Sequence, residues 1–182
     1  SEKSFENVTS MENLFYKCTG LTGAIPAELF VNAQKVTSFR NTFYGCSNFS
    51  GMIPAKLFYF KSDVTTYEGM FEGCKSLTAG EIAIDIKRAV NMDRMFKDCE
   101  ALESVVFGRN SRHLNGTAMF EGASSLRAVI LLNQATAQDQ VGVAKDLATL
   151  GLRDEAIIYV PYKANEEVYE QAWTTIPADR IE

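Results

Sequence analysis

Apolar and polar residues are distributed along this chain in a pattern that returns every 24–28 residues. Each copy has a phenylalanine, a small residue three positions later and an apolar residue six positions later. A further apolar residue precedes the phenylalanine by six or seven positions. A period of this length is typical of repeat architectures. The pattern appears five times, at Phe15, Phe43, Phe71, Phe96 and Phe120.

The repeat length predicts how these units bury their apolar residues. One unit of this size cannot bury its own apolar face, whereas stacked units bury a continuous core in which equivalent positions form columns. The residues after the +6 position are predicted to be short strands, as in 102–107 and 126–131, which have the spacing Leu-x-x-Val-x-apolar. Neighbouring units would pair these strands in parallel, about 4.8 Å apart. Gly and Pro near this position in the first two repeats predict shorter or irregular strands there.

The predicted fold class is an α/β repeat. We expect a leucine-rich-repeat solenoid with a short parallel β-sheet on one face, helical turns on the other and a C-terminal α/β cap. The helical turns are expected in the segments that lead into each phenylalanine, such as 10–16 and 93–97. The predicted boundaries are 1–132 for about five repeats and 133–182 for a capping region that contains a helix, a strand and a second helix. The strand of the cap is expected at 158–160.

The repeat resembles the cell-surface leucine-rich repeats of the BspA-like type, whose signature is Met-Phe-x-x-Cys-x-x-Leu. Met70-Phe71-Glu72-Gly73-Cys74-Lys75-Ser76-Leu77 carries it in full, and the match covers roughly residues 8–132. The chain departs from the family in having Ala123 where the fifth repeat should have cysteine, and in an extra helix-like stretch at about 136–150. Known members are bacterial surface or secreted proteins implicated in adhesion. The resemblance therefore implies a secreted or surface location and a binding role.

Charge and hydropathy narrow the classes of partner. The 182 residues carry a net charge of −5 with a pI of about 5.0, and Lys87-Arg88 is the one adjacent basic pair. Affinity for phosphate backbones comes from clustered Lys and Arg, so we expect no nucleic-acid binding. The longest apolar runs, such as 128–132, are far too short to cross a bilayer, so we expect no membrane insertion in this segment.

The four cysteines all occupy the same repeat position, three residues after the phenylalanine. They are Cys18, Cys46, Cys74 and Cys99. In a stack they would form one inward column. We favour buried free thiols, because a free cysteine behaves as a small hydrophobe and Ala123 takes its place in the fifth repeat. One disulfide between adjacent units is an alternative. A metal site is another, although no paired C-x2-C ligands are present.

Catalytic residues are not evident in the sequence. Catalysis by a Ser-His-Asp or Cys-His arrangement would have to use the single histidine, His113, which lies in a polar turn between repeats 4 and 5 and is interpreted as a solvated loop residue. No phosphate-binding or zinc-protease motif occurs. We therefore expect a protein that is not an enzyme and that needs no cofactor.

The expected function is an extracellular binding or adhesion module for an unidentified protein or glycan ligand. Outward strand residues would form the binding face, and Thr78, Glu103 and Arg127 are the candidates. Tyr59, in the dense apolar run 58–60, either packs between loops or belongs to a recognition surface. The alternative function is a structural spacer or stalk fragment of a larger surface protein.

Overall fold

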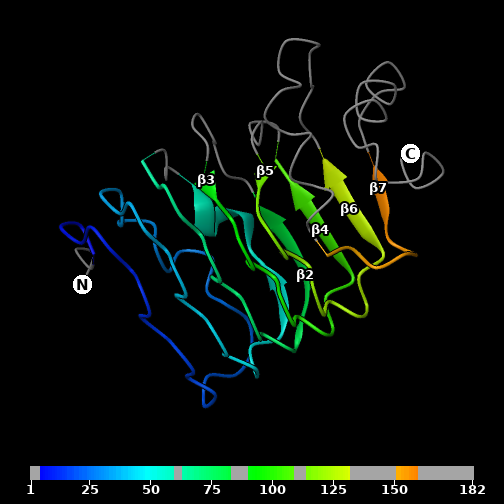
Figure 1. The fold of residues 1–182 in the computed structure, drawn as a ribbon. Coiled ribbons are helices and arrows are strands. Elements are labelled where there is room, and N and C mark those ends of the chain that lie inside the picture. Colours follow the sequence, from blue (N-terminus) through cyan, green and yellow to red (C-terminus); the bar gives the residue numbers. More distant parts are fainter. Residues whose placement is uncertain (1–4, 60–62, 83–89, 109–113, 132–150, 160–182) are drawn as a thin grey trace, which may run out of the picture.

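The computed structural model of this chain describes residues 5–59, 63–82, 90–108, 114–131 and 151–159 (Figure 1). Regular structure in these ranges is almost entirely β-strand, with one short 3-10 helix, η1 (Ala55–Phe58). Five parallel strands form the main sheet in the spatial order β1 (Gly51–Ile53), β2 (Leu77–Ile82), β4 (Ser104–Phe107), β6 (Ala128–Leu131) and β7 (Ile157–Tyr159). A second, two-stranded sheet pairs β3 (Val90–Asn91) with β5 (Leu114–Asn115).

The main sheet lies where the repeat predicts it, directly after the +6 position. In β4, Val105 and Phe107 are buried while Ser104 and Val106 are half-buried, which is the alternation of a strand with one face on a core. The first two repeats have the irregular strands that their Gly and Pro residues predict. β1 has three residues and a register shift between Gly51 and Met52, and the first repeat contributes a single bridge between Gly23 and Phe49.

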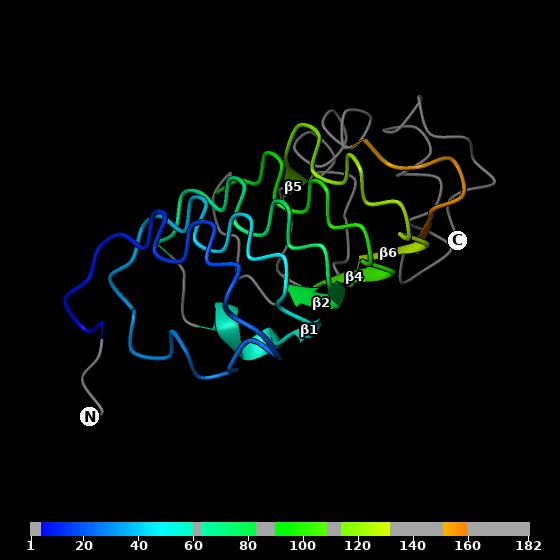
Figure 2. The same ribbon diagram turned by 90° about the horizontal axis from the view of Figure 1, so that it is seen from below.

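The segments that lead into each phenylalanine form hydrogen-bonded turns, not the helical turns expected from the sequence. In the first repeat the N–H groups of Asn13, Phe15 and Lys17 donate to carbonyls of the second repeat, at 3.0, 2.8 and 2.6 Å. The N–H groups between them donate within the repeat, as from Leu14 to the Met11 carbonyl at 3.2 Å. Figure 2 shows these turns along one side of the molecule and the main sheet along the other.

The reason for this difference is a pair of backbone positions with positive φ in every repeat. They lie two residues before and two residues after each phenylalanine. A left-handed residue ends a right-handed helical turn, and in the first four repeats its own N–H donates to a carbonyl of the next repeat. The residues at these positions are Asn13, Lys17, Asn41, Gly45, Gly69, Gly73, Arg94, Asp98, Ala118 and Gly122.

The core is a set of columns that run through all five repeats. The five phenylalanine rings stack in order, with centroids 5.3–5.8 Å apart and ring planes within 8° of parallel. Beside them, the thiols of Cys46, Cys74 and Cys99 are buried and each donates to the carbonyl of the phenylalanine in the preceding repeat, at 3.0–3.1 Å. All four cysteines are free, and Cys18 in the first repeat is half-buried. The prediction of buried free thiols is therefore confirmed for three of them.

Beyond the fifth repeat the structure describes residues 151–159. β7 pairs in parallel with β6, Ile158 is buried, and this strand lies at the position predicted for the strand of the cap. The two helices predicted on either side of it lie outside the described residues.

Candidate binding surfaces

Three of the four residues proposed from the sequence lie in one exposed row at the margin of the main sheet. The N–H of Glu103 donates to the carbonyl of Thr78 at 2.8 Å, and the N–H of Arg127 donates to the carbonyl of Glu103 at 2.8 Å. All three side chains are exposed. Because neighbouring strands lie about 4.8 Å apart, the row presents a hydroxyl, a carboxylate and a guanidinium at regular spacing.

The outer face of the sheet next to this row becomes more apolar toward the C-terminus. The register places Glu81 beside Val106, Val106 beside Ile130, and Ile130 beside Tyr159. Glu81 is exposed and the other three are half-buried. The exposed row therefore borders a surface with mixed polar and apolar character.

Tyr59, the fourth candidate, is not part of this row. It follows η1, and its side chain is 44% exposed while the preceding Phe58 is buried against Tyr67 with ring centroids 5.7 Å apart. The apolar run at 58–60 therefore divides into a core residue and an exposed residue, and Phe60 lies outside the described residues. His113 also lies outside them.

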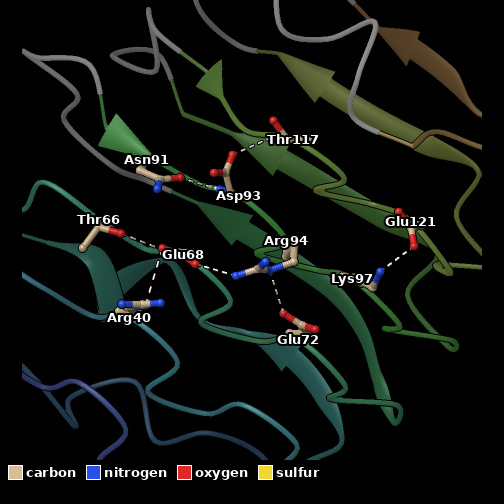
Figure 3. Close-up of polar contacts among 10 residues, drawn as sticks. All are labelled: Arg40, Thr66, Glu68, Glu72, Asn91, Asp93, Arg94, Lys97, Thr117 and Glu121. Carbon is tan, nitrogen blue, oxygen red and sulfur yellow. Dashed lines mark hydrogen bonds and ion pairs between the residues drawn. The ribbon is translucent and has the colours of Figure 1, made fainter.

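A second polar surface lies on the turn side, and sequence reasoning did not find it. Figure 3 shows Arg94 between two carboxylates of the preceding repeat, with 2.5 Å to Glu68 and 3.3 Å to Glu72. Glu68 also pairs with Arg40, one repeat further toward the N-terminus, at 3.5 Å. Each contact joins different repeats, so the network links three successive units.

Further contacts of the same kind join the later repeats. Lys97 pairs with Glu121 at 2.5 Å, and Lys75 pairs with Glu100 at 2.6 Å. The Asp93 carboxylate accepts from the Thr117 N–H at 2.6 Å (Figure 3). Exposed ion pairs contribute about 0–1 kcal/mol each, so these contacts mainly fix the register between repeats.

Of the carboxylates in the ion pairs of Figure 3, Glu72 is the least exposed. Its side chain is 13% exposed, and burial raises its pKa. The guanidinium of Arg94 lowers this pKa, but burial is the larger effect. Glu72 therefore gains a proton at higher pH than an exposed glutamate does.

A row of side-chain caps lies beside the network, five residues before each of the first four phenylalanines. Asn91 accepts the N–H of Asp93 at 2.8 Å, and Thr66 accepts the N–H of Glu68 at 3.1 Å (Figure 3). Ser38 accepts the N–H of Arg40 at 3.3 Å, and Ser10 accepts the N–H of Glu12 at 3.2 Å. The sequence signal was present, since short polar side chains recur at this position and favour such local turns.

The exposed Tyr16 and the half-buried Tyr44 stack on one another in the first two repeats. The rings of Tyr16 and Tyr44 lie 4.8 Å apart and 14° from parallel, and the Lys17 ammonium lies 5.2 Å from the centre of the Tyr16 ring. Tyr44 therefore covers one face of the Tyr16 ring, and a cation lies over that ring as well.

Three of the four cysteines are buried, and burial disfavours their thiolate form. Burial raises the pKa of Cys46 to about 11, and burial raises the pKa of Cys74 and Cys99 well above the ordinary range. The thiolate is the form that reacts and binds metals, so these three are structural residues. In the part of the chain that the structure describes, no group of three or more His, Cys, Asp or Glu side chains could hold a metal ion.

Within the same described ranges, no helix has the length and apolar character required to span a bilayer.

Together these features define a repeat protein with a parallel sheet on one side, hydrogen-bonded turns on the other and a continuous aromatic core between them. The chain belongs to the family described as "Mycoplasma protein of unknown function, DUF285", whose model matches residues 9–134. That range coincides with the five repeats. No curated protein matches the chain.

Proposed function

We propose that this protein is a leucine-rich-repeat solenoid of the BspA-like type that acts as a binding or adhesion module at a cell surface or outside the cell. The observation that carries the proposal is the contrast between uniform buried columns and variable exposed ones. The phenylalanine column is the same residue in all five repeats, whereas the exposed residue seven positions later is Thr22, Ser50, Thr78, Glu103 and Arg127 in turn. Solenoids vary in this way where they contact partners.

The sheet margin is the surface we assign to a protein or glycan ligand. Thr78, Glu103 and Arg127 are exposed, and within the described residues no ion pair joins Glu103 or Arg127 to another repeat as Arg94 is joined on the turn side. Neighbouring donors and acceptors on a rigid sheet are suited to polar recognition, because their positions are fixed before binding.

A binding screen with matched charge-swap variants tests this assignment. The purified chain is assayed against immobilised matrix proteins, serum proteins and glycans. We expect saturable binding to one class, and at least about a tenfold loss, equivalent to 1.4 kcal/mol, in a chain with Glu103→Arg and Arg127→Glu. The control has Lys75→Glu and Glu100→Lys, which exchanges an exposed ion pair on another part of the repeat and also keeps the net charge.

The outcomes separate the site from the function. Equal loss in both variants would mean that binding follows overall charge distribution and not the sheet margin. Binding that is lost only in a Tyr59→Ser chain would move the site to the segment after η1. A folded chain that binds none of the three classes would contradict the adhesion proposal.

The alternative function, a structural spacer, is supported by a different observation. On the turn side the charged residues Arg40, Glu68, Glu72 and Arg94 are engaged with each other between repeats. Such pairing stiffens a stack without leaving these groups for a partner. A spacer should give a folded, stiff chain that binds none of the ligands in the screen.

A further inference from the structure

From four residues before each phenylalanine to two residues after it, the backbone hydrogen bonds between repeats run in one direction. From residue 11 to residue 17, every second N–H donates to the next repeat, and the same holds for the second and third repeats. The carbonyls of the alternate residues therefore point toward the preceding repeat. In the first repeat these are the carbonyls of Ser10, Glu12, Leu14 and Tyr16, and none accepts a backbone hydrogen bond from the residues that the structure describes.

The core columns are uncovered at the same edge. Leu14 is 41% exposed, whereas Met70 at the equivalent position is 1% exposed. Phe15 and Cys18 are half-buried, whereas Phe71 and Cys74 are fully buried. Figure 1 shows this first repeat at the outer end of the stack, next to the N-terminus. One edge thus combines a row of acceptors with an incompletely covered aromatic and aliphatic strip.

We propose that this edge, formed by residues 10–18, is a docking surface for one further polypeptide coil that carries the same repeat pattern. Such a coil offers what the edge lacks: a row of N–H groups on alternate residues, all pointing the same way, and a phenylalanine ring to stack on Phe15. Unpaired backbone groups at the edge of a ladder are a template for another chain. This surface is distinct from the sheet margin, so the proposal does not depend on the proposed function.

The polarity of the edge selects this occupant over others. A second copy of this chain docked edge to edge would place carbonyls against carbonyls, which leaves every acceptor without a donor. A negatively charged ligand would face the same row of oxygens. A small aromatic ligand would cover the Phe15 ring but would leave the acceptors unpaired.

Cys18 supplies the readout, because it is the one half-buried thiol in this column of free cysteines. A chromogenic disulfide reagent is expected to modify Cys18 in the folded chain, while Cys46, Cys74 and Cys99 react on unfolding. The probe is the third repeat of this chain, residues 63–82 with Cys74→Ala. It is joined ahead of Ser1 through a flexible Gly/Ser linker of about 20 residues, since a tether of this kind gives an effective concentration of about millimolar.

We expect the tethered probe to slow modification of Cys18 by at least about tenfold. This factor corresponds to an effective probe concentration about ten times the Kd of the probe for the edge. The probe with Phe71→Asp should restore the rate. Leu14→Asp in the chain should also restore it, and the control Met52→Asp, at a residue that is 60% exposed on β1, should not.

Three results would overturn the proposal. The first is that Cys18 reacts as fast in the tethered chain as in the untethered chain. The second is that a scrambled probe protects Cys18 equally well. Protection that increases with concentration of the chain alone, with a matching increase in mass, would instead identify a second copy as the occupant.

Discussion

The first and third repeats carry the same motif in very different surroundings. Phe15 and Cys18 are half-buried, while Phe71 and Cys74 are buried with a neighbouring repeat on each side. The motif therefore does not itself determine how much apolar area is removed from water. That area is set by the two neighbours, as expected for a stack in which each unit contacts only adjacent units.

The largest test of this comparison is truncation of the aromatic column. Phe71→Ala should destabilise the chain by about 3–5 kcal/mol, because the ring is fully buried between Phe43 and Phe96. Phe15→Ala should cost about half as much, because one ring face has no stacked partner among the described rings. Equilibrium urea unfolding measures both. Equal losses at the two positions would show that position in the stack is unimportant.

A smaller effect is expected two residues after the phenylalanine, where the third repeat has Gly73 and the first has Lys17. Both have positive φ, +73° and +55°. Gly73→Ala should destabilise the chain by about 1–2 kcal/mol, because alanine is strained at a positive φ. The added Cβ itself has room, since its nearest neighbour, the Gly45 Cα, lies 3.5 Å away. Lys17→Ala is the control. It exchanges one strained side chain for another, so a loss as large as that of Gly73→Ala would argue against strain as the cause.

Four residues before the phenylalanine, the third repeat has Tyr67 and the first has Met11. Tyr67 is fully buried, and its hydroxyl has no hydrogen-bond partner in the described part of the chain. Tyr67→Phe removes this group and should stabilise the chain by about 1 kcal/mol. Thermal unfolding measures the change, with Tyr44→Phe as a control at a half-buried tyrosine. Destabilisation by Tyr67→Phe would mean that the hydroxyl has a partner in solution, such as water.

The sequence predicted the architecture of the sheet side well, because it depends on local pattern. The strands at β4 and β6, the irregular strand in the second repeat and the burial of Cys74 all follow from residues within one repeat. Thr78, Glu103 and Arg127 were also predicted to be outward, and all three are exposed.

The turn side was predicted less well for two physical reasons. Glycine and asparagine at positions such as Gly73 and Asn41 indicate left-handed residues, but Arg94 and Ala118 occupy the same positions and obscure the pattern. The contacts of Arg94 with Glu68 and Glu72 depend on register between repeats that differ in length. A sequence shows that such charges exist but not which of them meet.

The smallest expected effect is a pH dependence at Glu72, where the first repeat has the exposed Tyr16. Burial raises the pKa of Glu72 in the folded chain, so the folded state binds this proton more tightly than the unfolded state does. Its stabilising contribution is thus present below the unfolded pKa and is lost as pH rises through the folded pKa. Stability of Glu72→Gln relative to the unmodified chain should therefore increase between pH 4 and pH 7, as measured by urea unfolding at both values. Glu100→Gln, which removes a carboxylate with 53% exposure, is the matched control. A Glu72→Gln chain whose relative stability decreases over this interval would show that the ion pair with Arg94 outweighs burial.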